Sequence, residues 1–333
     1  MSARPVWTIA LIGAMVVWLS IFVASGQASL PDPDRVNPVA PDAETLATPA
    51  KRAPFKLADL LVSGHRHDQA GLAAPDGSST LAISGPMTGE RLALARRLDI
   101  NAARQDAVEQ TLPRTFVLVN IPQARLWMVR DGKVEGSMRV IVGRPDQPTP
   151  EMTAEITHVI LNPRWNVPQD IVRSTLAPTA ARSRGRSLTD AGFEVLSSWQ
   201  DDAVVVPARE IDWRAVAAGR TEAPVRQKPG ADNVMGSAKF VITNDDGIYL
   251  HDTPDRRAFR NSRRTLSAGC IRVEDYRHLV NFLVPQPLSP GRDPDRPTYI
   301  RLGAPMPIYL TYITAAASDG RPVLFPDPYE LDS

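Results

Sequence analysis

The stretch "TFVLVNIPQARLWMVRDGKVEGSMRVIVG", residues 115–143, has the composition of paired β-strands. Its apolar runs are rich in Val, Ile and Leu, and Asp131-Gly132 is a strong hairpin turn signal. Similar strand patterns follow in "AEITHVILNPRWNVP", "FEVLSSW", "DAVVVP", "KFVITN" and "GIYLHD", and "NDDG" is the turn that joins the last two. We therefore predict a mainly β domain with a few helices, an α+β fold.

Helical patterns are fewer. "QDIVRSTLAPTA" and "VEDYRHLVNFLV" each predict a short helix, while "TYIRL" and "PIYLTYITAA" predict two final strands. Residues 56–113 contain "KLADLLVSG" and a second amphipathic piece in which Leu94 and Leu98 stand four residues apart. We predict a short helical segment there.

The N-terminus has the pattern of an export signal. Arg4 precedes an apolar run without charges, Val6 to Ala24, and small residues follow it. Residues 1–28 are predicted to be a signal peptide, or a membrane anchor if they stay uncleaved. The proline-rich residues 29–55 are predicted to be a tether. Both predictions place the protein outside the cytoplasm, in the periplasm or cell envelope.

Composition argues against several classes of protein. The chain has 38 Lys and Arg against 37 Asp and Glu, a balance that gives no support to a nucleic-acid partner. His65 and His67 stand in the predicted loop "GHRHDQ" without a further cluster of ligands, so we predict no metal and no cofactor.

Cys270 is the only cysteine among 333 residues. A lone thiol cannot form an intrachain disulfide, and an idle thiol in an exported protein is a liability, which favours a reactive role. "TLSAGCIRV" places it in a predicted loop leading into a helix, where backbone N–H groups and the helix dipole would favour the thiolate. The N–H groups of Ala268, Gly269 and Cys270 are candidate oxyanion donors.

His251 is the candidate base, because it ends a predicted strand in "GIYLHDTP". Alternation along that strand puts Tyr249 on the same face, where its ring would line a cleft. No acid is evident as a third member, so either a backbone carbonyl or Ser267 would orient the imidazole.

The segment "GIYLHDTPDRRAFRNSRRTLSAGCIRV" resembles the signature of the L,D-transpeptidases, the YkuD family, and most closely its larger YcbB-like subgroup. The positions that fit are His251, Ser267, Gly269, Cys270 and Arg272. Ala268 replaces the histidine of many members, as a small residue does in the YcbB-like ones. The resemblance extends in order over most of residues 114–333.

The resemblance implies a YkuD-type catalytic domain over residues 114–333, with an inserted capping subdomain at 182–236. Cys270 would attack the L-centre carbonyl of diaminopimelate in a peptidoglycan stem tetrapeptide, release D-alanine, and pass the acyl group to a diaminopimelate side-chain amine. His251 would be the proton acceptor and donor, and Gly269 would lie at the oxyanion site. Trp165, Asn166, Tyr249 and Arg272 would contact the stem peptide, and carbapenems would acylate the thiol.

Other readings use the same residues. An L,D-carboxypeptidase or a lipoprotein-attaching enzyme would form the same acyl-enzyme and differ only in the acceptor. More distant alternatives are a sortase-like transpeptidase, although only 19 positions separate His251 from Cys270, and a non-catalytic wall-binding protein.

Overall fold

The computed structural model describes residues 56–69, 89–200, 202–284, 295–318 and 321–332. The predicted export segment and tether, residues 1–55, lie outside this set. Within it, no helix has the length and apolar character needed to cross a membrane.

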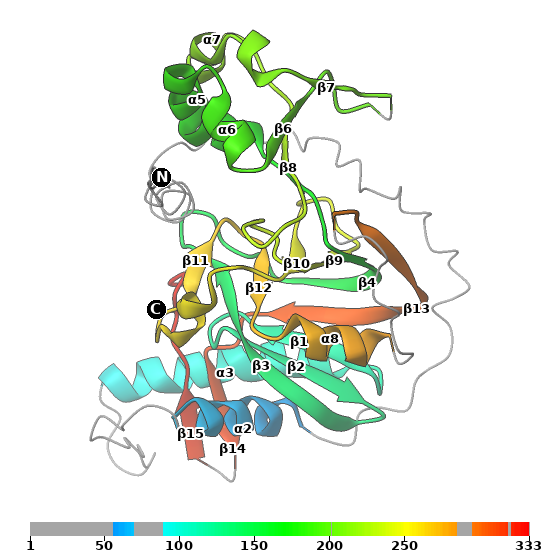
Figure 1. Cartoon of the computed structure of the whole chain (residues 1–333). Helices are drawn as coiled ribbons and strands as arrows, with labels where there is room; N and C mark the ends of the chain where they lie inside the picture. Colours follow the sequence, from blue (N-terminus) through cyan, green and yellow to red (C-terminus); the bar gives the residue numbers. More distant parts are fainter. Residues whose placement is uncertain (1–55, 70–88, 201, 285–294, 319–320, 333) are drawn as a thin grey trace, which may run out of the picture.

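A closed β-barrel forms the body of the molecule (Figure 1). Nine strands share one sheet in the order β11-β3-β12-β10-β9-β4-β13-β1-β2, and β2 also pairs with β3, which closes the ring and leaves β11 attached outside it. The strands are β1 (Phe116–Asn120), β2 (Arg125–Arg130), β3 (Lys133–Gly143), β4 (Met152–Leu161), β9 (Ala238–Ile242), β10 (Tyr249–His251), β11 (Thr265–Ser267), β12 (Ile271–Val273) and β13 (Thr298–Thr311). This mainly β fold confirms the predicted fold class.

The predicted hairpin joins β2 to β3. Asp131 and Gly132 both have positive φ, at 50° and 75°, as the turn type that suits a twisted hairpin requires. Nearly every residue of β1 and β2 is buried, which means that both faces of these strands are covered. One face lines the barrel core, and the other packs under the N-terminal helices.

The N-terminal helices are α2 (Leu57–Gln69) and α3 (Gly89–Glu109), at the bottom of Figure 1. Leu57, Leu60 and Leu61 of α2 join Trp127 in a second apolar cluster outside the barrel. The prediction of a loop around His65 and His67 was wrong, because both residues lie within α2.

The buried face of α3 is polar, although its sequence suggested an apolar stripe. Leu94 and Leu98 are only half-buried, whereas Asn101 and Gln105 are buried. Asn101 Nδ2 donates to Thr314 Oγ1 at 3.0 Å, and Gln105 Nε2 donates to the Ala315 carbonyl at 3.2 Å. Hydrogen bonds to the C-terminal part of the chain therefore hold this helix.

The C-terminal strands differ from the prediction. "TYIRL" and the start of "PIYLTYITAA" form one strand, β13, whose pairing with β4 shifts register between Arg301 and Met306. The bulge absorbs the intervening residues, so Gly303 and Pro305 interrupt the pairing without ending the strand. The rest pairs as the hairpin β14 (Ala315–Ser318) and β15 (Arg321–Leu324).

A small unit is inserted between β4 and β9 and stands at the top of Figure 1. Its four-stranded sheet has the order β5-β8-β6-β7 and its own apolar core. The elements are β5 (Trp165–Asn166), α4 (Gln169–Ile171), η1 (Val172–Leu176), α5 (Ala177–Ser183), α6 (Arg186–Asp190), β6 (Phe193–Leu196), β7 (Val205–Val206), η2 (Ala208–Glu210), α7 (Trp213–Ala217) and β8 (Val225–Gln227). The predicted subdomain boundary at residue 182 falls inside α5, because the core of this unit already begins at Trp165.

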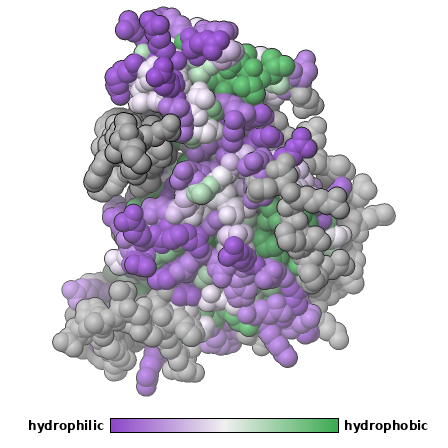
Figure 2. Space-filling view, viewed as in Figure 1, coloured by the Kyte–Doolittle hydropathy of each residue, from purple (hydrophilic) through white to green (hydrophobic). Residues whose placement is uncertain are grey.

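The surface in this view is largely hydrophilic, with an apolar area on the small unit (Figure 2). Val204 and Val205, which belong to that unit, are among the large apolar residues exposed to solvent. Two remaining elements, η3 (Arg256–Arg260) and α8 (Tyr276–Leu283), flank β11 and β12 in the chain.

Candidate active site

Two neighbouring parallel strands bring the predicted nucleophile and base together. In the β10–β12 pair, Leu250 stands opposite Ile271 and His251 stands opposite Arg272. Leu250 and Ile271 both point into the barrel core. Because side chains alternate along a strand, Tyr249 and His251 of β10 and Arg272 of β12 face outward, and Cys270 immediately precedes β12 on the same side.

His251 is buried, with an exposed fraction of 4%. Its Nδ1 lies 2.5 Å from the carbonyl oxygen of Asp252. A carbonyl only accepts hydrogen bonds, so Nδ1 carries the proton and Nε2 keeps its lone pair. The sequence left two groups that could orient the imidazole, a backbone carbonyl or Ser267. In the structure the backbone carbonyl of Asp252 binds the ring.

Burial lowers the pKa of His251 to about 3, and the nearby positive charges of Arg272 and Lys239 act in the same direction. The hydrogen bond to Asp252 opposes this shift. The imidazole is therefore neutral at physiological pH, which is the form that can accept a proton.

The low pKa of His251 predicts a loss of stability in acid. Below its ordinary pKa near 6.5 the unfolded chain binds a proton that the folded chain refuses, so stability falls with pH by about 1.4 kcal/mol per unit until the folded pKa is reached. His251→Gln removes this titration. The difference in unfolding free energy between wild type and this variant, measured from pH 7.5 to 4.5, should shift against the wild type as pH falls. A constant difference would show that His251 titrates normally.

Cys270 lies in the bend between β11 and β12 and is half-buried. Its thiol is 3.8 Å from the Gly247 carbonyl. Burial raises the pKa of the thiol, while hydrogen bonds from the backbone and side chain of Tyr249 and the charges of Lys239 and Arg272 lower it. The net shift is upward, so the thiol rests protonated beside a neutral imidazole.

The expected helix dipole at Cys270 is not present. A strand, β12, follows the cysteine directly, and α8 begins only at Tyr276 with Asp275 as its N-cap. The influence of a helix dipole fades within its first turn, so it does not reach a residue that far ahead. Lys239 and Arg272, not a helix, supply the positive charge at this thiol.

Tyr249 connects the pair to its surroundings. Its ring centroid lies 5.9 Å from that of His251, and Lys239 Nζ lies 4.3 Å from the centre of the tyrosine ring. Tyr249 also packs against the apolar core of the small unit. The predicted cleft residue is thus the point where the barrel site meets the inserted unit.

Gly269 and Ser267 shape the backbone at the thiol. Gly269 has a φ of 102°, a conformation that side chains disfavour, and an added Cβ would lie 3.1 Å from Ile248 Cδ1. Ser267 Oγ donates to the Cys270 carbonyl at 2.6 Å. Its hydroxyl therefore holds the cysteine backbone, and the histidine ring is held by Asp252 instead.

Arg272 presents a desolvated cation beside the thiol. Burial lowers the pKa of its guanidinium, while Asp255 and Cys270 raise it. Among the described residues, none accepts a hydrogen bond from its buried Nε. A buried donor without an acceptor is costly and suits a site that receives an anionic ligand.

Trp165 and Asn166 lie on β5 of the small unit. Trp165 is buried in the core of that unit, with its ring 6.3 Å from that of Phe193. Asn166 pairs with Arg226 of β8. Their connection to the Cys–His pair runs through Tyr249, which packs on the same cluster.

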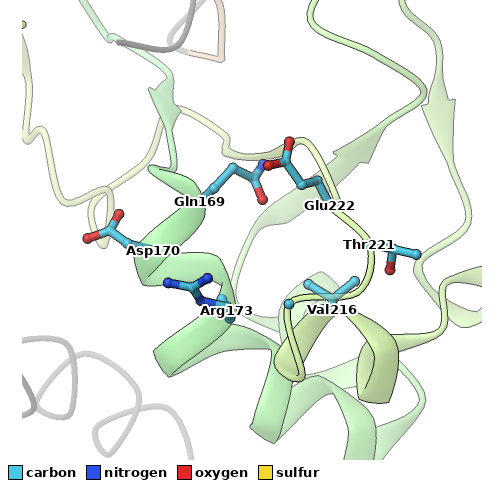
Figure 3. Close-up of a pocket in the computed structure, with 7 residues that line it drawn as sticks. Gln169, Asp170, Arg173, Val216, Thr221 and Glu222 are labelled. Carbon is cyan, nitrogen blue, oxygen red and sulfur yellow. The ribbon is translucent and has the colours of Figure 1, made fainter. Parts of the chain in front are cut away.

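A separate pocket lies within the small unit (Figure 3). Gln169 from α4 reaches across it, and its side-chain amide donates to the Ala223 carbonyl at 2.9 Å. Arg173, Asp170 and Glu222 give the lining both signs of charge. None of the predicted site residues lines this pocket, so it is distinct from the Cys–His site.

Sequence reasoning missed three residues of this site. Lys239 alternates with the buried Phe240 on β9, a period that marks it as outward-facing. Asp252 contributes only its backbone to the histidine, which residue type cannot reveal. Thr149 donates its hydroxyl to the Gly269 carbonyl at 2.6 Å across 120 positions of sequence.

A neutral histidine and a lone cysteine on the outer face of a closed barrel define a site suited to covalent acyl transfer. The model of the YkuD family, the L,D-transpeptidase catalytic domain, matches residues 114–308. The chain belongs to this family.

A curated protein of Haemophilus influenzae, named as an L,D-transpeptidase, is 31% identical over 251 residues. The match covers 74% of this chain and 50% of the relative, so the chain spans about half the length of that protein.

Solved L,D-transpeptidases are also similar. One from Mycobacterium smegmatis has 14% identity and a TM-score of 0.29, with 60% of this chain and 58% of that chain covered. L,D-transpeptidase 3 from Mycobacterium tuberculosis has 14% identity and a TM-score of 0.30, with coverages of 60% and 61%.

Proposed function

We propose that this protein is a transpeptidase that cross-links peptidoglycan in the cell envelope, with Cys270 as nucleophile and His251 as the proton acceptor and donor. The observation that carries the proposal is the neutral, buried imidazole, whose Nδ1 is bound to the Asp252 carbonyl while Nε2 stays available on the face of the only cysteine. The YcbB-like subgroup and an export signal at residues 1–28 are part of the same proposal.

Acylation begins from the neutral pair. As Sγ attacks the L-centre carbonyl of diaminopimelate, the thiol proton moves to His251 Nε2. The oxyanion that forms accepts hydrogen bonds from the backbone around Gly269 and Cys270. The imidazolium then protonates the leaving nitrogen, free D-alanine departs, and a thioester to Cys270 remains.

Deacylation reverses these roles. A diaminopimelate side-chain amine attacks the thioester, gives a proton to His251, and the thiolate leaves and is reprotonated. The neighbouring charges of Lys239 and Arg272 stabilise the thiolate and disfavour the imidazolium. The same acyl-enzyme would give an L,D-carboxypeptidase with water as acceptor, or attach a lipoprotein through one of its amines.

Substrate recognition draws on charge. We assign Arg272, with its unpartnered Nε, to a carboxylate of the stem peptide, and Tyr249 to the wall of the cleft. The small unit is proposed to cap the groove. Trp165 and Asn166 stay predicted groove residues, and the burial of Trp165 in the core of that unit favours an indirect effect.

Incubation of the full chain with purified disaccharide tetrapeptides tests this function. We expect mass analysis to show free D-alanine and a dimer equal to two muropeptides minus one D-alanine. Muropeptides whose diaminopimelate amine has been acetylated serve as the control, since they can donate but not accept. A tripeptide product alone would identify a carboxypeptidase, and absence of D-alanine release would overturn the proposal.

A further inference from the structure

Two buried hydroxyl groups hold the peptide groups on either side of the nucleophile. Thr149 Oγ1 donates to the Gly269 carbonyl at 2.6 Å, and Ser267 Oγ donates to the Cys270 carbonyl at 2.6 Å. The Gly269 carbonyl and the Cys270 N–H belong to one planar peptide group and point in opposite directions. Thr149 therefore determines where the Cys270 N–H points.

The proton of the Thr149 hydroxyl is committed to this contact. Its oxygen accepts a hydrogen bond from the Gly143 N–H at 2.8 Å, which leaves the single hydroxyl proton directed at Gly269. Donation to the carbonyl also polarises the peptide group and strengthens its N–H as a donor.

Tyr329, near the C-terminus, fixes the loop that carries Thr149. Its hydroxyl donates to the Gly143 carbonyl at 2.8 Å and accepts from the Thr149 N–H at 3.1 Å. These two contacts bridge the start and the end of the connection that leaves β3. Figure 1 shows the C-terminal chain running from β15 up beside the barrel toward β11.

The C-terminal segment, residues 325–332, is itself anchored at several points. The ring of Tyr329 stacks on Tyr312 with centroids 5.3 Å apart, and Tyr312 Oη donates to Asp327 at 2.6 Å. The carboxylate of Asp332 accepts from Asn101 and Arg104 of α3, at 3.0 and 2.7 Å. A continuous series of contacts thus joins α3 to the peptide group at Cys270.

We propose that Thr149 and Tyr329 are positioning residues through which the C-terminal segment aims the Cys270 N–H at the oxyanion. The proposal rests on the acyl-transfer function given above. It predicts an effect on reactions that build a tetrahedral oxyanion and none on the nucleophilicity of the thiol. The side-chain hydrogen bonds of Thr149 and Tyr329 go to Gly143, Gly269 and the Thr149 N–H, not to Sγ or His251.

Thr149→Val separates the two effects. Acylation by a carbapenem forms an oxyanion, whereas alkylation by iodoacetamide does not. Loss of an entire oxyanion donor costs roughly 100- to 1,000-fold, so misdirecting one donor should slow acylation about 10- to 100-fold. Alkylation of Cys270, followed by intact mass, should proceed close to the wild-type rate.

Three further variants complete the design. Thr149→Ser keeps the hydroxyl and should restore acylation, and Tyr329→Phe should slow it by a smaller factor than Thr149→Val. Thr311→Val is the matched control, because the buried Thr311 hydroxyl donates to the Val119 carbonyl at 3.2 Å in the barrel wall. It should leave the ratio of acylation to alkylation unchanged.

The proposal would be overturned if Thr149→Val were acylated by the carbapenem at the wild-type rate. It would also be overturned if the variant slowed acylation and alkylation by the same factor. If that variant fails to fold, Tyr329→Phe decides, since it removes one oxygen and should still slow acylation alone. Failure of the muropeptide reaction in the wild type would instead reject the proposed function, because carbapenem acylation of Cys270 needs no stem peptide.

Discussion

Cys270→Ala should yield no cross-linked muropeptide and no covalent carbapenem adduct. Alanine has no nucleophilic atom, and the chain has no second cysteine to take its place. The wild type should gain one carbapenem mass, which peptide mapping should assign to Cys270. The melting temperature should stay close to that of the wild type, because the substitution removes one half-buried sulfur in a bend between strands.

Cys270→Ser is the control for this prediction. Its hydroxyl keeps the approximate shape of the site but is a far poorer nucleophile without a serine-type triad, so acylation should nearly cease. Cys270 would not be the nucleophile if the purified Cys270→Ala variant still cross-linked muropeptides, or if peptide mapping found the carbapenem on another residue.

His251→Ala should reduce turnover by roughly 100- to 10,000-fold, the range expected when a general base and acid are lost together. The thiol rests protonated, since burial raises its pKa, and an external base is needed to remove its proton during attack. Carbapenem acylation, followed by intact mass over time, should slow with muropeptide turnover. Cys270 should remain accessible to iodoacetamide.

His278→Ala is the matched control for the base. His278 belongs to α8, and its ring faces Gly136 of β3, on a different element from the Cys–His pair. This variant should keep near wild-type turnover. If His251→Ala kept a near-normal rate of turnover, His251 would not be the base, and His278 or His158 would be the candidates for that role.

Local signals in the sequence predicted the elements of the fold better than their assembly. Asp131-Gly132 marked the β2–β3 hairpin because two positive φ angles favour such residues. Closure of the barrel also needs non-local pairings, such as β1 with β13 and β3 with β12, and no short stretch encodes them. The polar face of α3 was missed for the same reason, since Asn101 and Gln105 find their partners some 210 positions away.

The small unit shows how composition can misplace a boundary. Its cationic and glycine-bearing stretches begin near residue 182, but its apolar core includes Trp165, Val172 and Leu176. Apolar residues look alike in sequence whether they belong to one core or to another. Only their contacts in the folded structure show to which core each residue belongs.

Local features of the sequence specify the chemistry that the site can offer: one thiol, a histidine at the end of a strand, and small residues beside the cysteine. They also mark Tyr249 and His251 as sharing one face, because alternation along a strand is a local property. The tertiary structure decided the protonation state of the pair. Desolvation and the charges of Lys239 and Arg272 depend on what surrounds each group, and the Asp252 carbonyl selects the tautomer. It also decided which distant residues hold the peptide group at Cys270, because hydrogen bonds between Thr149, Tyr329 and Gly269 exist only once the barrel has closed.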